Sequence, residues 1–414
     1  MKNLEKILWL AAIGGFIVGA YGLYDRVVGG HINVSYGSYV PWGLWVGAYI
    51  YLVGVSAGAF LISALVYALG VKRLEKIGKL ALFTAVVALG VSMFSIWLDL
   101  GHPERALELV LRTNFGSMMG WMIWLYSAYF VLLLAELWFA LRGDFAVWSA
   151  RKDFAGTLAR FLSFGQRDVS DKALARDKNV LRVLGSIGIP LAVAFHGGVG
   201  ALFGVVGARP YWNTGLTPIM FLVGALLSGG ALLTFVVLVF GPNQGSEEHR
   251  STVVFLGQIV LGLLLLDVLL EWAEYSIGLY SAVPADVASM KLVLFGSFAW
   301  VFWGVHIALG VVIPALILIV RRKSPMWVGI AGLLIAITFI SVRLNIVIPG
   351  LAVPELQGLQ DAYTGPGLDL SYVPTLTEWL MQVWIVATGL LAFLIGYRVL
   401  PIVTRGTTDT TARA

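Results

Sequence analysis

The chain has 414 residues, of which 59% are hydrophobic and only 12% are charged, and its formal net charge is +5. A soluble domain carries about 25% charged residues, so a chain this poor in charge cannot cover itself with a solvated surface, and lipid must be its solvent. The absence of cysteine excludes disulfides, thiolate-held iron–sulfur clusters, c-type haem attachment and cysteine zinc sites. The positive charge lies in short loops, so it does not indicate nucleic-acid binding.

Apolar segments long enough to cross a hydrocarbon core of about 30 Å recur along the whole chain. They are continuous and do not alternate with polar residues, so they favour helices over the strands of a β-barrel. The sequence therefore predicts an all-α integral membrane protein with about ten spans. We place these spans at 7–24, 41–70, 80–99, 118–142, 183–207, 216–241, 252–276, 290–320, 326–348 and 377–400.

The basic residues predict the orientation of these spans. If the amino terminus is inside, 22 of the 28 Lys and Arg residues fall in inside segments, and five fall in outside segments. The positive-inside rule then predicts that both termini lie in the cytoplasm. We expect the chain to lie in the cell membrane of a prokaryote. One soluble-looking linker, 143–182, is expected on the cytoplasmic face as amphipathic helix and loop, and it separates spans 1–4 (1–142) from spans 5–10 (183–414).

Span 3 ends with an ionisable pair, Asp99 and His102. If the helix continues through both residues, their spacing of three places them on one face, where a carboxylate can orient an imidazole and exchange a proton with it. That chemistry suits a group that gives or takes protons, such as a quinone carbonyl. The alternative is a polar helix end at the membrane interface, closed by Pro103.

Other ionisable residues at membrane depth gather in the outer halves of spans 5, 7 and 9. Asp267, Glu271 and Glu274 form one stripe of span 7, and their like charges require protonation or a partner, for which Arg343 is the candidate. The stripe reads either as a candidate proton path or as a structural ion-pair network. His196 and His306 could ligate haem, but no two histidines have the facing arrangement of a cytochrome b bundle. Buried, hydrogen-bonded histidines are therefore the preferred interpretation, and neither haem nor a metal site is expected.

Several motifs together resemble the NrfD/PsrC family of quinone-interacting membrane subunits. They are Tyr39-Val-Pro-Trp-Gly43, Gly54-Val-Ser-Ala-Gly58, Leu98-Asp99-Leu-Gly-His102-Pro103-Glu-Arg105, Ser117-Met-Met-Gly-Trp121 and Ala208-Arg-Pro-Tyr-Trp-Asn-Thr-Gly-Leu-Thr-Pro218. The ten-span plan and the segment Tyr372-Val-Pro-Thr-Leu-Thr-Glu378-Trp379 are similar to the longer members of the family, which include DsrP-like subunits of sulfur-metabolism complexes.

The resemblance implies a quinone pocket, with menaquinone as the expected quinone, in a four-helix bundle of spans 2–5 near the outer face. A further bundle would comprise spans 6–9. By matching position, Trp42, Asp99, His102 and His196 surround the quinone ring. The resemblance also implies that a ferredoxin-like iron–sulfur subunit docks on the outer face, and that other redox subunits complete a respiratory complex.

Two other classes of function are compatible with the residues. Buried carboxyls also occur in secondary transporters and proton channels, although broken helices in paired repeats, which would favour transport, are not evident in the sequence. A membrane anchor without turnover is the third interpretation. A quinone-reactive subunit that is not an enzyme alone is the preferred one, because the family motifs and the outer gathering of polar residues agree.

Overall fold

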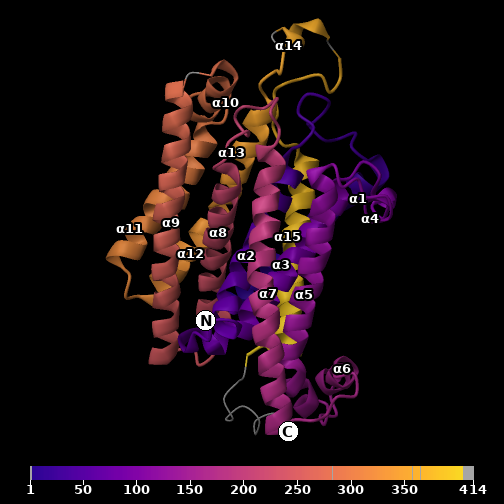
Figure 1. Cartoon of the computed structure of the whole chain (residues 1–414), viewed down its shortest axis with the longest axis vertical. Coiled ribbons are helices and arrows are strands. Elements are labelled where there is room, and N and C mark those ends of the chain that lie inside the picture. Colours follow the sequence, from indigo (N-terminus) through magenta and orange to yellow (C-terminus); the bar gives the residue numbers. More distant parts are fainter. Residues whose placement is uncertain (1, 282, 357, 364, 404–414) are drawn as a thin grey trace.

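The computed structural model describes residues 2–281, 283–356, 358–363 and 365–403, and most of its helices run side by side along one long axis (Figure 1). Within these residues, ten helical segments have the length and composition to cross a membrane, which confirms the predicted all-α fold. Helices suit these apolar runs because each backbone N–H and C=O finds its partner inside the segment. The long helices are α1 (Lys2–Gly29), α2 (Leu44–Tyr67), α3 (Gly78–Asp99), α5 (Met118–Trp148), α7 (Asp171–Gly204), α8 (Thr217–Phe240), α9 (Glu247–Ser281), α12 (Pro325–Thr338), α13 (Ile340–Leu351) and α15 (Leu376–Val399).

Shorter elements lie between and at the ends of the long helices. They are η1 (Lys72–Ile77), η2 (Pro103–Arg105), α4 (Glu108–Leu111), α6 (Phe154–Leu162), α10 (Pro284–Leu294), η3 (Val301–Val312), α11 (Ile313–Val320) and α14 (Leu359–Ala362). Most of them mark the turns between spans. By contrast, η3 and α11 together form a span, Val301–Val320.

The spans form two bundles that share α8. Helices α2, α3, α5 and α7 pack in a ring, as predicted for spans 2–5. Helices α8, α9, η3–α11 and α12–α13 form the second bundle, as predicted for spans 6–9. Helix α8 also packs against α2 and α7, so it is the common wall of both bundles.

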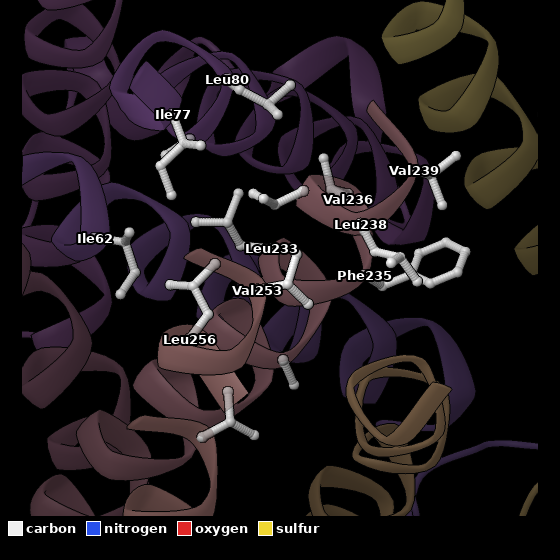
Figure 2. Packing of buried hydrophobic residues seen from close by; sticks show 14 of the residues in the cluster. Ile62, Ile77, Leu80, Leu233, Phe235, Val236, Leu238, Val239, Val253 and Leu256 are labelled. Atoms are coloured by element: carbon white, nitrogen blue, oxygen red, sulfur yellow. The ribbon is translucent and has the colours of Figure 1, made fainter. Parts of the chain in front are cut away.

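The junction of the two bundles combines a close helix crossing with a large apolar core. A Cβ atom on Gly58 of α2 would lie 2.2 Å from the Ala225 carbonyl oxygen of α8, and one on Gly229 of α8 would lie 2.5 Å from the Val55 carbonyl oxygen. Glycine is therefore required for this approach, as at other small-residue crossings in membranes. Figure 2 shows the adjoining core, where side chains of α2, η1 and α3 meet those of α8 and α9.

Two predicted spans differ from the structure. The segment 290–320 was expected as one helix, but α10 ends at Leu294 and η3 begins at Val301, so the span is the shorter segment 301–320. The expected helix is wrong because the chain turns at 295–298, where the Phe298 N–H donates to the Leu292 carbonyl. The predicted span 326–348 is a helix in two parts, α12 and α13, which meet at Phe339.

The first and last long helices pack against each other in opposite directions. Gly15 of α1 lies beside Ala387 of α15, whereas Gly22, two turns later, lies beside Met381. Glu5 and Arg398 form an ion pair at the other end of the contact. The start of α1 and the end of α15 therefore lie at the same end of the molecule, while 404–414 fall outside the described residues.

We name the two ends of the bundle face A and face B. Face A comprises the segments 30–43, 100–117, 205–216, 283–300, 352–356, 358–363 and 365–375. Hydrogen bonds tie several of them together, including Ser38 N–H to the Gly367 carbonyl at 2.9 Å. Face B comprises 68–77, 149–170, 241–246 and 321–324, with the ion pair between Lys76 and Glu248. In Figure 1, α10 and α14 mark face A, and α6 marks face B. Face A is the one that the basic residues place outside.

The linker at face B is shorter than expected. Helix α5 extends to Trp148 and α7 begins at Asp171, so only 149–170 connects them, with the amphipathic helix α6 in the middle. A buried ion pair between Arg142 and Asp177 holds the two extended helices together, and Arg142 also donates to the Asp168 carbonyl at 2.7 Å. The division into 1–142, 143–182 and 183–414 stays a prediction.

Candidate functional site

Trp42 lies at face A, two residues before α2 begins, in a cluster of aromatic rings. Its indole stacks on Trp212, with ring centroids 6.0 Å apart and planes within 17°, and it meets the edge of Phe203 at 5.9 Å. Trp212 is held in turn by its own N–H, which donates to the Ile346 carbonyl at 2.7 Å. The cluster therefore joins the start of α2 to the end of α7, the loop 205–216 and α13.

Asp99 is the last residue of α3, and its carboxylate accepts a hydrogen bond from the Tyr36 hydroxyl at 2.8 Å. The guanidinium of Arg26 closes the same helix end by donating to the carbonyls of Leu98 and Leu100, at 2.7 and 2.6 Å. Burial and the neighbouring Asp99 carboxylate both raise the pKa of Tyr36 well above its usual range. Tyr36 therefore remains a phenol and a permanent donor to Asp99.

His102 does not share a helical face with Asp99, so the expected pairing is wrong. The helix ends at Asp99 because Leu100 adopts an extended conformation with ψ of 133°. His102 lies in the following loop, exposed, and its Nδ1 is 2.9 Å from a carboxylate oxygen of Glu104. The partner of Asp99 is thus Tyr36, and the partner of His102 is Glu104.

His196 is buried on α7 and faces α2. Its Nε2 lies 2.9 Å from the Val53 carbonyl oxygen and its Nδ1 lies 3.1 Å from the Ala192 carbonyl oxygen. A neutral imidazole carries one N–H, so it donates to only one of these two carbonyls at a time. The side chain ties α7 to α2, in a surrounding that includes the rings of Phe195 and Tyr129.

The structure thus places Trp42, Asp99, His102 and His196 in four different surroundings. Each has its own partners, and no hydrogen bond, ion pair or ring contact among the described residues joins any two of them. The interior of the first bundle between them is filled by aromatic side chains, with Tyr126 stacked on Tyr49 and in edge contact with Phe195. None of these three residues, nor Tyr36, was predicted from the sequence to belong to the site.

The carboxyl stripe of α9 has a partner other than the expected one. Nε2 of His306, from η3, lies 2.8 Å from a carboxylate oxygen of Glu271, and both side chains are nearly inaccessible. Glu274 accepts a hydrogen bond from the Thr214 hydroxyl at 3.3 Å. Asp267 is also buried, one turn deeper on the same helix.

Arg343 forms no ion pair within 4.0 Å in the described part of the chain, so the expected direct pairing with the stripe is wrong. Its guanidinium lies over the ring of Phe221, 4.2 Å from the centroid, and donates to the Phe221 carbonyl at 3.3 Å. Gly224 provides the space, since a Cβ atom there would be 2.7 Å from a guanidinium nitrogen. Arg343 therefore faces α8, while His306 takes the position beside Glu271.

A small cavity of about 40 Å³ lies beside the Glu271–His306 pair. Its polar lining includes Glu274, Tyr211, Tyr275 and Asn345, and Trp212 belongs to the same wall. The Tyr211 hydroxyl donates to the backbone carbonyl of Asn345 at 2.9 Å, but the side-chain amide of Asn345 is buried and has no hydrogen-bond partner among the described residues. A cavity of this size with unsatisfied polar groups accommodates water.

His306 lies in a π-helical stretch, Val301–Val312. The wider turn is visible at its end, where the Ile313 N–H donates to the Ala308 carbonyl, five residues back. Pro314 follows and has no N–H to continue the usual pattern. Long π-helical stretches are rare and often mark functional sites, and this one presents His306 to the cavity.

The match to known proteins covers most of the chain. The family model described as "Polysulphide reductase, NrfD" matches residues 34–355. The chain belongs to the NrfD family. The expectation drawn from the five sequence motifs is therefore confirmed.

Several relatives align with the chain over nearly their whole length. A selenate reductase subunit of Mesobacillus selenatarsenatis is 36% identical over 96% of this chain and 95% of its own. The Hdr-like menaquinol oxidoreductase integral membrane subunit of Archaeoglobus fulgidus is 27% identical, over 93% of this chain and 91% of its own. The menaquinone reductase integral membrane subunit of Nitratidesulfovibrio vulgaris is 26% identical, over 97% and 93%. This NrfD-family chain is therefore similar to integral membrane subunits of oxidoreductases.

Proposed function

We propose that this NrfD-family chain is the quinone-interacting membrane subunit of a respiratory oxidoreductase complex, with menaquinone as its quinone. The observation that carries the proposal is the alignment, over more than nine-tenths of both chains, with two membrane subunits named for menaquinol and menaquinone. The chain would sit in the cell membrane of a prokaryote, with face A outside and both termini inside.

The residues at face A fit the demands of a quinone ring in part. A quinone, when bound, supplies two-electron chemistry that also takes up or releases two protons. Asp99 with its Tyr36 donor is a half-buried group able to hold or pass a proton, and Trp42 offers an aromatic surface. We propose these as the ring contacts, His102 as an exposed residue at the entrance, and His196 as a positioning residue on α7.

Electrons must reach the quinone from another subunit. The chain contains no cysteine, so it has no thiolate with which to hold an iron–sulfur cluster. We propose that a ferredoxin-like iron–sulfur subunit docks on face A, near Asp99, and that further redox subunits complete the complex. We also propose a context of sulfur metabolism for this complex. The relative with 36% identity is named for selenate reductase, so selenate is a second candidate acceptor.

The test is quinol-linked electron transfer by the complex purified with this chain tagged. Asp99→Asn keeps the shape of the side chain but removes its titration, so turnover is expected to fall by about 10²-fold or more, as when a positioned acid or base is lost. Both selenate and sulfur-compound acceptors would be assayed. Asp361→Asn, an exposed carboxyl in α14, is the matched control and is expected to leave turnover unchanged.

Normal turnover in Asp99→Asn would remove Asp99 from the quinone site. A wild-type complex without iron–sulfur subunits, or without any quinone-dependent turnover, would overturn the proposed function itself. Tyr36→Phe separates proton exchange from folding, because it removes the hydrogen bond to Asp99 while the ring remains. It is expected to lower turnover and to shift its pH profile without loss of assembly.

A further inference from the structure

We propose that Glu274 connects a cleft on face A with the smaller cavity beside Glu271 and His306, and that together they form a proton half-channel. The cleft has a volume of about 320 Å³ and lies between the loop 205–216, the end of α9 and the start of α10. Glu274 lines both this cleft and the smaller cavity. Its carboxyl is therefore placed to exchange protons with both compartments.

The route from the cleft inward consists of groups that can pass a proton. Thr214 lines the cleft and donates its hydroxyl hydrogen bond to Glu274. Behind Glu274, the cavity has room for water next to the Glu271 carboxylate and His306, which are already hydrogen-bonded at 2.8 Å. A proton from cleft water would bind Glu274, cross through cavity water and settle on the Glu271–His306 pair.

The route ends inside the molecule, which makes it a half-channel. Asp267 lies one turn deeper, and the buried side of α9 then continues towards face B as Leu264, Val260 and Leu256. Apolar side chains of this kind do not carry protons. A proton taken up at the pair therefore leaves by the same route, and only face A exchanges with it.

Other ionisable groups set the charge around the pair. Asp267, Glu274 and Tyr275 come from α9, Tyr211 from the loop 205–216, Asp286 from α10 and Arg343 from α13. Arg343 is a buried cation that interacts electrostatically with Asp267 and Glu271, although it makes no ion pair within the described residues.

The link to the quinone rests on the proposed function. Trp212 lines the cavity and stacks on Trp42, so a single indole separates the cavity from the proposed ring contact. A change of charge on a quinone ring at Trp42 would alter the electrostatic potential at the Glu271–His306 pair. A proton taken up or released by the pair would offset that change. The half-channel would then take up or release a proton at face A in step with the quinone.

The experiment measures protonation without turnover, so that its failure and the failure of the quinone proposal remain separate. Infrared difference spectra of the purified complex would be recorded across a pH step, and the exchange of carboxyl bands would be timed in D₂O. A carboxyl band lost in Glu271→Gln and perturbed in His306→Gln is expected. Glu274→Leu is expected to slow the exchange of that band by about tenfold or more, because it removes a positioned proton carrier.

Glu136→Gln is the matched control. Glu136 is another buried carboxyl, on α5, whose two oxygens lack hydrogen-bond partners among the described residues, so its substitution removes only its own band. Unchanged exchange in Glu274→Leu would overturn the route through Glu274. A wild-type spectrum without any band sensitive to Glu271→Gln would overturn proton storage at the pair. Neither result would bear on the proposed quinone function, which is tested separately by the turnover assay.

Discussion

The chemical role open to a buried ionisable residue depends on its hydrogen-bond partner. His196 and His306 are both buried histidines within spans, but the Nε2 of His196 meets a backbone carbonyl, while that of His306 meets a carboxylate. The first arrangement fixes two helices, and the second can store a proton. Sequence alone could not distinguish them, because Glu271 and His306 are 35 residues apart and come from different elements.

The same limit explains the errors at Asp99 and Arg343. Spacing predicted a helical pair between Asp99 and His102, but the helix ends at the first of them, and the partner is Tyr36, 63 residues earlier. The placement of Asp99 near face A, and of Glu271 and Glu274 in one stripe, did follow from the sequence, because membrane depth and helical period are local properties. The identity of the partner depends on packing between helices.

A buried ion pair at face B gives a prediction at the residue scale. Arg142 is fully buried and pairs with Asp177, whose side chain is 6% exposed. Arg142→Met removes the buried partner of Asp177 and leaves only the longer contact with the exposed guanidinium of Arg176, at 3.7 Å. Breaking a buried pair costs about 3–5 kcal/mol. The thermal unfolding midpoint of the purified protein in detergent should therefore fall clearly.

The neighbouring pair of Arg151 and Asp153 is the control. Both side chains are about half exposed, at 47% and 48%, and such surface pairs contribute little. Arg151→Met is expected to leave the midpoint unchanged. Equal midpoints for both variants would show that the Arg142–Asp177 pair does not stabilise the ends of α5 and α7.

At the scale of elements, hydropathy is sufficient to predict that a span exists, but it does not predict where a helix is interrupted. All ten spans could be predicted because each is a long apolar run. The turn at 295–298 and the π-helical stretch of η3 could not be predicted, since Phe295 and Phe298 are apolar and the sequence of 301–312 is typical of an ordinary helix. Composition does not indicate whether a backbone N–H donates to the carbonyl four residues earlier, as in an α-helix, or five residues earlier, as in a π-helix.

The crossing of α2 and α8 gives a prediction at this scale. In Gly58→Ala, the new Cβ would lie 2.2 Å from the Ala225 carbonyl oxygen, and a backbone atom cannot move aside by changing rotamer. The helices must separate, and overpacking of this kind costs about 1–3 kcal/mol. A lower unfolding midpoint and a lower yield of folded protein are expected.

Gly262→Ala, on α9, controls for the loss of glycine. A Cβ atom at position 262 has no atom within 4 Å, so only helix propensity changes, in favour of alanine by about 1 kcal/mol. Its midpoint should be equal to or above that of the wild type. A Gly58→Ala protein as stable as Gly262→Ala would mean that the two bundles do not depend on this close approach.

At the scale of the whole molecule, the two faces differ in what they carry. Face B has the basic segments, with Lys72, Arg73 and Lys76 in η1 and Arg321 to Lys323 after α11. Face A has the open cleft, the Trp42 cluster and the Asp99–Tyr36 pair. Charge and candidate chemistry thus lie at opposite ends of one bundle, as the proposed docking of a redox partner and the proposed proton exchange on the outside require.

Labelling of single cysteines tests this orientation, and the chain suits it because it contains no cysteine of its own. Cysteines would be placed at Leu107 and Asp361 on face A, and at Glu75 and Lys323 on face B, all of which are exposed. Positive segments stay in the cytoplasm, so a membrane-impermeant maleimide should label 107 and 361 in intact cells. Positions 75 and 323 should react only after the membrane is permeabilised, and the unsubstituted chain should not react at all. Labelling of 75 or 323 in intact cells would invert the molecule. It would move the cleft, Glu274 and the proposed docking face to the cytoplasm, so that any proton exchanged at the Glu271–His306 pair would come from inside the cell.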